Sequence, residues 1–167
     1  MTDTLHSSRL VLRPFANKDA EPVTKFIGNL DVSRWLTHVP YPYALTDAQW
    51  FIENEQKMPG VSYAIDLDDT FIGAVSHGET LGYWISQPHW GNGYASEAAR
   101  RLIEHRFDNG ATQIESGYHL GNAASCNVLT KLGFAPSTQE IVYSRSLKHH
   151  VILQRMGLFR VDWEAVQ

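Results

Sequence analysis

Small side chains gather where an expected strand over residues 80–86 passes into an expected alanine-rich helix over residues 95–107. The turn between them contains Gly91 and Gly93, and the helix begins with Ala95 and Ser96. With so little side-chain bulk, backbone amides can approach an anion closely, and the helix dipole adds partial positive charge. The segment therefore predicts a pyrophosphate site, although glycines at such a corner also serve simply to permit a tight turn.

The same turn lacks the residues of other phosphate-binding motifs. No Gly-Lys-Ser/Thr closes it, and it has neither the third glycine nor the downstream acidic residue of a dinucleotide-binding fingerprint. We therefore disfavour a kinase-like enzyme, an NAD-dependent enzyme and a nucleotide-binding regulator.

Polar side chains that could move protons follow the neighbouring elements. Ser125 falls in the first turn of a helix that Asn122 is expected to cap, where its hydroxyl either donates a proton or bonds a nearby carbonyl. His77 and Glu79 near the central strands, and His119 after the strand over 113–118, are the candidate bases. Histidine titrates near neutral pH, but each of the three also fits an exposed strand-end residue.

The hydrophobic pattern predicts a mixed α/β fold that positions these residues. Apolar residues at every second position indicate strands, and apolar residues that recur about every 3.6 positions indicate helices. The expected order is a strand over 9–13, helices from Asp19 to Leu30 and from Thr46 to Lys57, strands over 62–67, 70–76 and 80–86, a helix over 95–107, a strand over 113–118, a helix from Asn122 to Leu132, and strands over 140–147 and 151–157.

Local signals predict where several of these elements begin and end. Asp19 is expected to cap the first helix, and Thr46-Asp47-Ala48-Gln49 has the pattern of a capping box. Asp68-Asp69 suits a two-residue hairpin turn, and Gly110 and Gly133 suit helix ends. His149-His150 is expected at the tip of the last hairpin.

Composition narrows the class of protein. The 167 residues, 43% hydrophobic with a net charge of −4, suit one domain over 1–167 with a substantial core. A single cysteine, no expected signal peptide and no long apolar run favour a cytoplasmic protein that does not enter membranes. Without a basic block we expect no nucleic-acid partner, and the eight histidines lack metal-ligand spacing, so no metal is expected.

The sequence resembles the GCN5-related N-acetyltransferases, the GNAT superfamily, and in particular their RimJ/RimL-like branch. The resemblance rests on Gly82-Tyr83-Trp84-Ile85 with Trp90-Gly91-Asn92-Gly93-Tyr94-Ala95-Ser96-Glu97-Ala98, which is similar to the family's motif A. Gly121-Asn122-Ala123-Ala124-Ser125 with Leu132-Gly133-Phe134 resembles its Asn-x-x-Ser helix and Leu-Gly-Phe ending. The opening strand over 9–13 fits as well.

The resemblance implies a mostly antiparallel central sheet flanked by helices, with a V-shaped split between the fourth and fifth expected strands, 80–86 and 113–118. It implies acetyl-CoA in that split as co-substrate. The implied cofactor contacts are Trp84, Ile85, Ser86, Trp90, Gly91, Asn92, Gly93, Tyr94, Ala95, Ser96, Asn122 and Ser125.

The resemblance further implies direct transfer of an acetyl group to a primary amine, either a protein or peptide N-terminus or a small amine. Ser125 matches the position that protonates the departing thiolate, and Trp35, Tyr41 and Tyr43 border the acceptor side. RimL-like relatives place a glutamate base in the stretch that here reads Tyr143-Ser144-Arg145-Ser146, so His77, Glu79 and His119 remain the candidates. Because that glutamate is missing, an acyl-CoA sensor without turnover stays as the alternative; a monomer and a homodimer are both compatible with the sequence.

Overall fold

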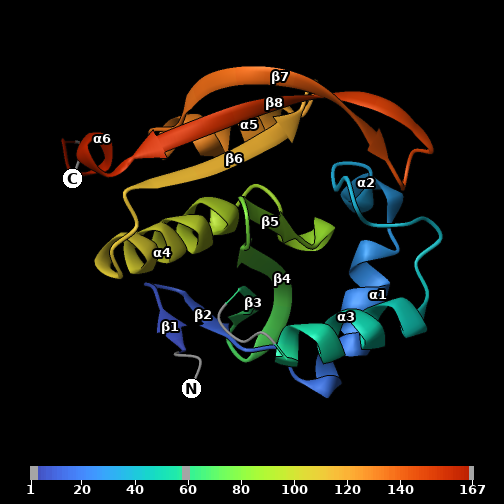
Figure 1. Cartoon of the computed structure of the whole chain (residues 1–167). Coiled ribbons are helices and arrows are strands. Elements are labelled where there is room, and N and C mark those ends of the chain that lie inside the picture. The colour runs from blue at the N-terminus through green and yellow to red at the C-terminus, as the bar shows by residue number, and fades with distance from the viewer. Residues whose placement is uncertain (1–3, 58–60, 166–167) are drawn as a thin grey trace.

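The computed structural model describes residues 4–57 and 61–165, whose strands form one eight-stranded sheet in the order β1-β2-β3-β4-β5-β6-β8-β7 (Figure 1). Its neighbouring strands are antiparallel except for β5 and β6, which run parallel. The strands are β1 (Leu5–His6), β2 (Leu10–Arg13), β3 (Ser62–Leu67), β4 (Thr70–His77), β5 (Leu81–Ile85), β6 (Gln113–His119), β7 (Ala135–Ser144) and β8 (His149–Phe159). The mixed, mostly antiparallel fold expected from the sequence is confirmed.

Helices cover both faces of this sheet. They are α1 (Ala20–Ile27), α2 (Leu30–Ser33), α3 (Leu45–Lys57), α4 (Tyr94–Asp108), α5 (Ala123–Lys131) and α6 (Arg160–Ala165). On β3, Tyr63 and Ile65 pack with α4 in one apolar cluster, whereas Ala64 packs with α1 and α3 in another. Successive residues of β3 therefore point to opposite faces of the sheet. Because helices cover both faces, β3 is buried along most of its length.

The sheet splits between β5 and β6. These strands share one residue pair, Leu81 with Ser116, where the Ser116 hydroxyl donates to the Leu81 carbonyl at 2.8 Å. Beyond that pair β6 follows β8, with which it pairs from Gln113 to His119, while β5 stays with β4. These are the fourth and fifth expected strands; the short β1, which was not expected, shifts their labels by one.

Several local predictions hold because they rest on backbone conformation. Asp68 and Asp69 have φ of 48° and 62° and join β3 to β4, as a two-residue hairpin turn requires. Gly110 and Gly133 follow α4 and α5 with φ of 92° and 91°, a left-handed conformation that favours glycine at a helix end.

The side-chain caps predicted for the first two helices do not form. Asp19 stands at the N-cap position of α1, but its buried carboxylate accepts the Ala16 amide at 2.8 Å and pairs with Arg13, and it makes no capping bond to α1. Helix α3 begins at Leu45, one residue before the expected cap Thr46, and Asp47 accepts the Ala44 amide at 2.8 Å.

Two expected element boundaries are also wrong. The first helix stops at Ile27, and Leu30 starts the separate α2, whose Asn29 side chain accepts the Asp31 amide. His149 and His150 open strand β8, because Lys148 takes the left-handed conformation, with φ of 60°, that turns the hairpin.

Among the residues described, no helix combines the length and the apolar character needed to cross a bilayer.

Candidate active site

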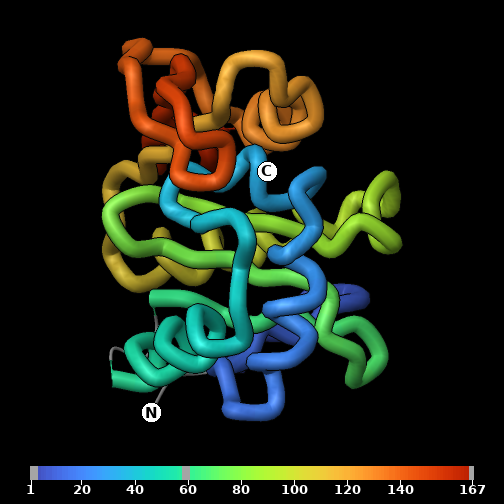
Figure 2. Tube along the Cα trace, turned by 90° about the vertical axis from the view of Figure 1, so that its right-hand side faces the viewer, coloured from blue at the N-terminus to red at the C-terminus, as the bar shows by residue number. Residues whose placement is uncertain are grey.

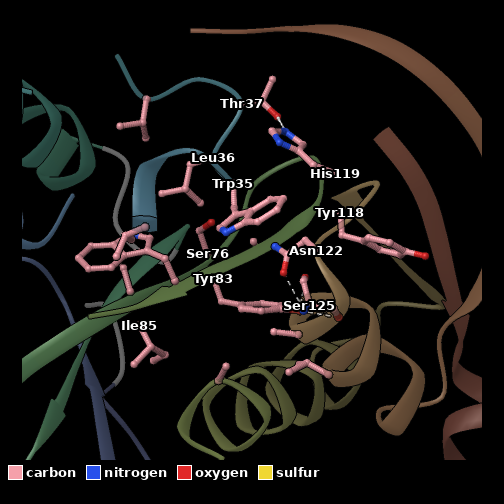
Figure 3. A pocket seen from close by; sticks show the side chains of 18 of the residues that line it. Trp35, Leu36, Thr37, Ser76, Tyr83, Ile85, Tyr118, His119, Asn122 and Ser125 are labelled. Atoms are coloured by element: carbon pink, nitrogen blue, oxygen red, sulfur yellow. Dashed lines mark hydrogen bonds between the residues drawn. The ribbon is translucent and has the colours of Figure 1, made fainter. Parts of the chain in front are cut away.

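A cavity of about 1150 Å³ occupies the split. Its walls come from β4, β5, β6, the start of α4, the start of α5 and the segment over residues 35–39 (Figure 3). Figure 3 shows Trp35 and Leu36 across the cavity from Tyr83 and Ser125. The cavity thus joins the glycine turn at one end to the aromatic segment at the other.

The glycine turn presents its backbone to this cavity. Gly91 and Gly93 have φ of 75° and 79°, and both line the cavity with Tyr94, Ala95 and Ser96. The first amide of α4 that finds a helical acceptor is that of Glu97, which donates to the Gly93 carbonyl at 3.0 Å. Within the described residues the amides over 91–96 have no acceptor, so they form an array of free donors at a helix N-terminus.

Arg9 holds the glycine turn in place, a role that sequence reasoning missed. Its Nη2 donates to the Asn92 carbonyl at 3.0 Å, its Nε donates to Glu97 at 2.7 Å, and its guanidinium stacks over the Tyr94 ring at 4.6 Å. Although burial acts to raise it, the pKa of Glu97 lies below its usual value because Ser7 and Arg9 donate hydrogen bonds to the carboxylate. The Arg9–Glu97 ion pair thus fixes the position of the turn relative to α4.

Two of the predicted cofactor contacts do not line the cavity. The buried Ser86 donates its backbone amide to the Ile72 carbonyl at 2.8 Å, and its hydroxyl shares a hydrogen bond of 2.6 Å with His89 Nδ1. The Asn92 side-chain amide bonds the carbonyls of His89 and Trp90, so it stabilises the turn from outside. The side chains of Ser86 and Asn92 are therefore not free for a cofactor, because their polar groups bond within the turn and to β4, whereas the Asn92 backbone amide stays free.

Trp84 and Ile85, the other two predicted cofactor contacts on β5, line the cavity. Gly73 of β4 lets β5 approach closely, since a Cβ added there would collide with the Trp84 carbonyl oxygen. The Ile85 carbonyl accepts the indole N–H of Trp90 at 2.6 Å. Trp90 thereby lies over the end of β5 as part of the cavity wall.

The centre of the cavity contains two hydroxyl groups in contact. Tyr83 Oη and Ser125 Oγ share a hydrogen bond of 2.9 Å, and Asn122 Oδ1 accepts the Ser125 amide at 3.1 Å, which confirms Asn122 as the cap of α5. Burial raises the pKa of Tyr83 to about 12, so its phenol stays protonated at neutral pH. The sequence marks Tyr83 only as part of the motif, and alternation along β5 does not single it out, because its neighbours Gly82 and Trp84 line the cavity as well.

His119 is the one predicted base that lines the cavity. Its ring is 3% exposed, Nε2 and Thr37 Oγ1 form a hydrogen bond of 2.8 Å, and Nδ1 is buried without a partner among the described residues. Burial lowers the pKa of His119, against a smaller opposing effect of the Arg34 backbone. The imidazole is consequently neutral at pH 7 and able to accept a proton.

The other two candidate bases lie elsewhere. Ser76 lines the cavity, so His77, the next residue of β4, faces the opposite side, where burial and the Arg106 charge lower its pKa. Glu79 is exposed in the turn between β4 and β5 and does not line the cavity. Because of the direction in which the strand and the turn present these side chains, the structure does not bring either residue into the cavity.

Two of the three predicted acceptor-side residues line the cavity. Trp35 and Tyr43 do so, whereas Tyr41 is 37% exposed in the preceding loop and does not. Burial and the Asp47 charge raise the pKa of Tyr43 to about 12, so its hydroxyl is a neutral donor.

The stretch that lacks the expected glutamate has a different role here. Arg145 donates its amide to the Thr37 carbonyl at 3.0 Å and its Nη1 to the His38 carbonyl at 3.2 Å. The Ser146 hydroxyl donates to the Ser33 carbonyl at 2.9 Å. The turn of the β7–β8 hairpin thus holds the segment over 33–38 across the split, and Figure 2 shows the two lying together.

Comparisons with known proteins agree with this geometry. A family model described as an acetyltransferase (GNAT) domain matches residues 9–135. An uncharacterized N-acetyltransferase of Bacillus subtilis, YoaA, is 28% identical over 148 residues, covering 80% of this chain and 84% of its own. The chain therefore belongs to the GNAT acetyltransferase family, a family of acyltransferases, so it is identified as an enzyme that uses a coenzyme A ester.

Solved structures show the same fold. Mycobacterium smegmatis RimJ in complex with CoA-disulfide superposes with a TM-score of 0.78 at 20% identity, covering 95% of this chain and 88% of its own. The microcin C7 self-immunity acetyltransferase MccE in complex with acetyl-CoA and AMP superposes with a TM-score of 0.75 at 19% identity, covering 91% and 93%. Among the described residues no group of three or more His, Cys, Asp or Glu side chains could hold a metal ion.

Proposed function

We propose that this protein transfers the acetyl group of acetyl-CoA directly to a primary amine, as a member of the RimJ/RimL-like branch. The observation that carries the proposal is the hydroxyl pair of Tyr83 and Ser125, 2.9 Å apart between the glycine turn and the aromatic segment. The amides over 91–96 would bind the pyrophosphate, and the pantetheine arm would pass Trp84 and Ile85. The likeness in fold to RimJ supports the branch, and no observation favours a sensor without turnover.

The residues at the centre suit both proton transfers that the reaction needs. The amine nitrogen attacks the thioester carbonyl, and the carbon–sulfur bond then breaks. Ser125 would donate a proton to the departing sulfur, and Tyr83 would polarise the Ser125 hydroxyl. His119, neutral and lining the same cavity, would accept the proton that the amine loses.

Initial-rate kinetics test direct transfer. If both substrates must be bound together, varying acetyl-CoA at several fixed amine concentrations is expected to give intersecting reciprocal plots, with no acetylated enzyme detected by mass spectrometry. Parallel plots together with acetylated protein would show a covalent intermediate and would overturn the proposal.

His119 makes both turnover and stability depend on pH. Replacing it with Gln is expected to lower kcat by about 100-fold with little change in the KM for acetyl-CoA, because a general base contributes about that much. Since the folded-state pKa of His119 is lowered, the unfolded chain binds its proton more readily. The free energy of unfolding of the parent protein should therefore fall as pH decreases from about 6.5 towards the folded-state pKa.

Urea unfolding at a series of pH values measures this effect. His119→Gln should lose less of its free energy of unfolding at acid pH than the parent protein does, and the loss that remains is due to His77. The control His149→Gln, at the exposed start of β8, should lose as much as the parent protein. An unchanged acid dependence in His119→Gln would contradict the burial argument, and an unchanged kcat would remove His119 as the base.

A further inference from the structure

Part of the cavity lining is apolar and lies in or against the cluster with α1 and α3; we call this part the acceptor chamber and define it by Ile27, Leu36, Val39, Tyr43 and Phe51. These residues come from α1, the segment over 35–39, the loop before α3, and α3 itself. They belong to the apolar cluster that packs under β3 and β4, or lie against it. Phe51 is fixed by an edge-on contact with Phe15 at 5.2 Å between ring centroids.

The described residues that line the cavity include no Asp, Glu or Lys. Among the described lining residues, Arg155 is the one with a permanent charge. Glu140 neutralises this charge, because its carboxylate accepts a hydrogen bond from Arg155 Nε at 2.7 Å. Asp47 affects Tyr43 electrostatically, but its carboxylate accepts the Ala44 amide and does not line the cavity. The chamber therefore offers no counter-charge to a second ammonium group and no free cation to a carboxylate.

Three residues hold the wall of the chamber in place. The segment over 33–38 is bonded by Arg145 and Ser146 from the hairpin turn and by His119 from β6. Trp35 and Leu36 point into the cavity from this segment (Figure 3). A chamber fixed on both sides of the split and walled by α1 and α3 suits the body of a small molecule better than an extended chain.

The apolar walls also favour the reactive form of the amine. Burial disfavours the charged ammonium and lowers the pKa of an amine that enters, so a monoamine reaches the uncharged state that attack requires. A polyamine would keep a second charge in the same surroundings, where an unpaired charge is strongly disfavoured. The chamber thereby selects for one amino group on an apolar body.

We propose that the acceptor is a small primary monoamine that carries an apolar group of aromatic size, seated in the acceptor chamber. This inference rests on the proposed function and names its substrate class. The new bond joins the amine nitrogen to the acetyl carbon while the carbon–sulfur bond breaks. The amine proton passes to His119, and the sulfur takes a proton from Ser125.

Thiol release from acetyl-CoA tests the inference with four probes: 2-phenylethylamine, ethylamine, spermidine and a peptide with a free N-terminus. We expect kcat/KM for 2-phenylethylamine to exceed that for ethylamine and for spermidine by about 100-fold, since the first comparison removes the apolar group and the second adds unpaired charge. Higher kcat/KM for spermidine or for the peptide would overturn the inference and leave the proposed function standing. Thiol release with none of the amines, despite acetyl-CoA binding, would overturn the proposed function itself.

A charge placed in the chamber supplies the matched test. Val39→Asp is expected to lower kcat/KM for 2-phenylethylamine and to shift its ratio to spermidine by about 30-fold towards the polyamine, because a carboxylate can pair the second ammonium. Trp50→Asp is the control, since Trp50 neighbours Phe51 on α3 but is 69% exposed and lies outside the cavity lining. An unchanged ratio in Val39→Asp, or an equal shift in Trp50→Asp, would show that the chamber does not select the acceptor.

Discussion

Replacing Tyr83 with Phe and Ser125 with Ala together is expected to lower kcat by about 1000-fold, within the range of general acid catalysis, while acetyl-CoA affinity changes little. The two hydroxyls contact each other at 2.9 Å and both residues line the cavity, so the double variant removes the proposed proton donor and the hydroxyl that polarises it. Each substitution removes an oxygen and keeps most of the side-chain volume. Steady-state kinetics with calorimetry of acetyl-CoA binding separates the two effects.

The single variants show which hydroxyl acts on sulfur. Ser125→Ala should account for most of the loss, and Tyr83→Phe for less, because Tyr83 works through Ser125; their effects should not add, as expected for groups in contact. Equal losses of kcat and of acetyl-CoA affinity in Ser125→Ala would make Ser125 a binding residue. A kcat unchanged in the double variant would remove the pair from the mechanism.

Gly93→Val is expected to weaken acetyl-CoA binding by about 1000-fold, the equivalent of losing two or three charge-assisted hydrogen bonds. The residue holds φ of 79° at the N-terminus of α4, a conformation that a β-branched residue adopts only with strain. Relief of that strain would turn the amides over 91–96 away from a common centre. Calorimetric titration with acetyl-CoA measures the loss.

Gly110→Val provides the matched control for backbone strain. Gly110 has φ of 92° after α4, with nothing within 4 Å of an added Cβ, and it does not line the cavity. Both variants should lower the melting temperature, but only Gly93→Val should lose acetyl-CoA. Full affinity in Gly93→Val would refute the assignment of the turn as the pyrophosphate site.

The sheet was largely predictable because its signals are local. The Asp68-Asp69 turn, the helix ends at Gly110 and Gly133, and the cap at Asn122 each depend on the conformation or hydrogen bond of one or two residues. At Thr46 the helix begins one residue earlier than expected, whereas the cap at Asp19 fails because of a contact with the preceding strand. Asp19 is drawn to Arg13, which also pairs with Asp66 of the neighbouring strand β3, and no local pattern reveals that contact.

The site divides in the same way. The glycine turn and Ser125 could be found from the sequence, because motif and element coincide there. The cavity-lining position of His119, its bond to Thr37 and the hold of Arg145 on the segment over 33–38 join residues far apart in the chain. From the sequence alone His77 and Glu79 cannot be distinguished from His119, because only the fold decides that neither of the two lines the cavity.

Whether this protein is an acetyl-CoA-dependent amine acetyltransferase is tested by calorimetric titration of the purified protein with acetyl-CoA, followed in the same preparation by thiol release with the four amines. We expect saturable binding with one acetyl-CoA per chain, and thiol release that requires an amine and yields one acetylated amine per thiol. Absence of binding, or binding without thiol release from any amine, would contradict this activity.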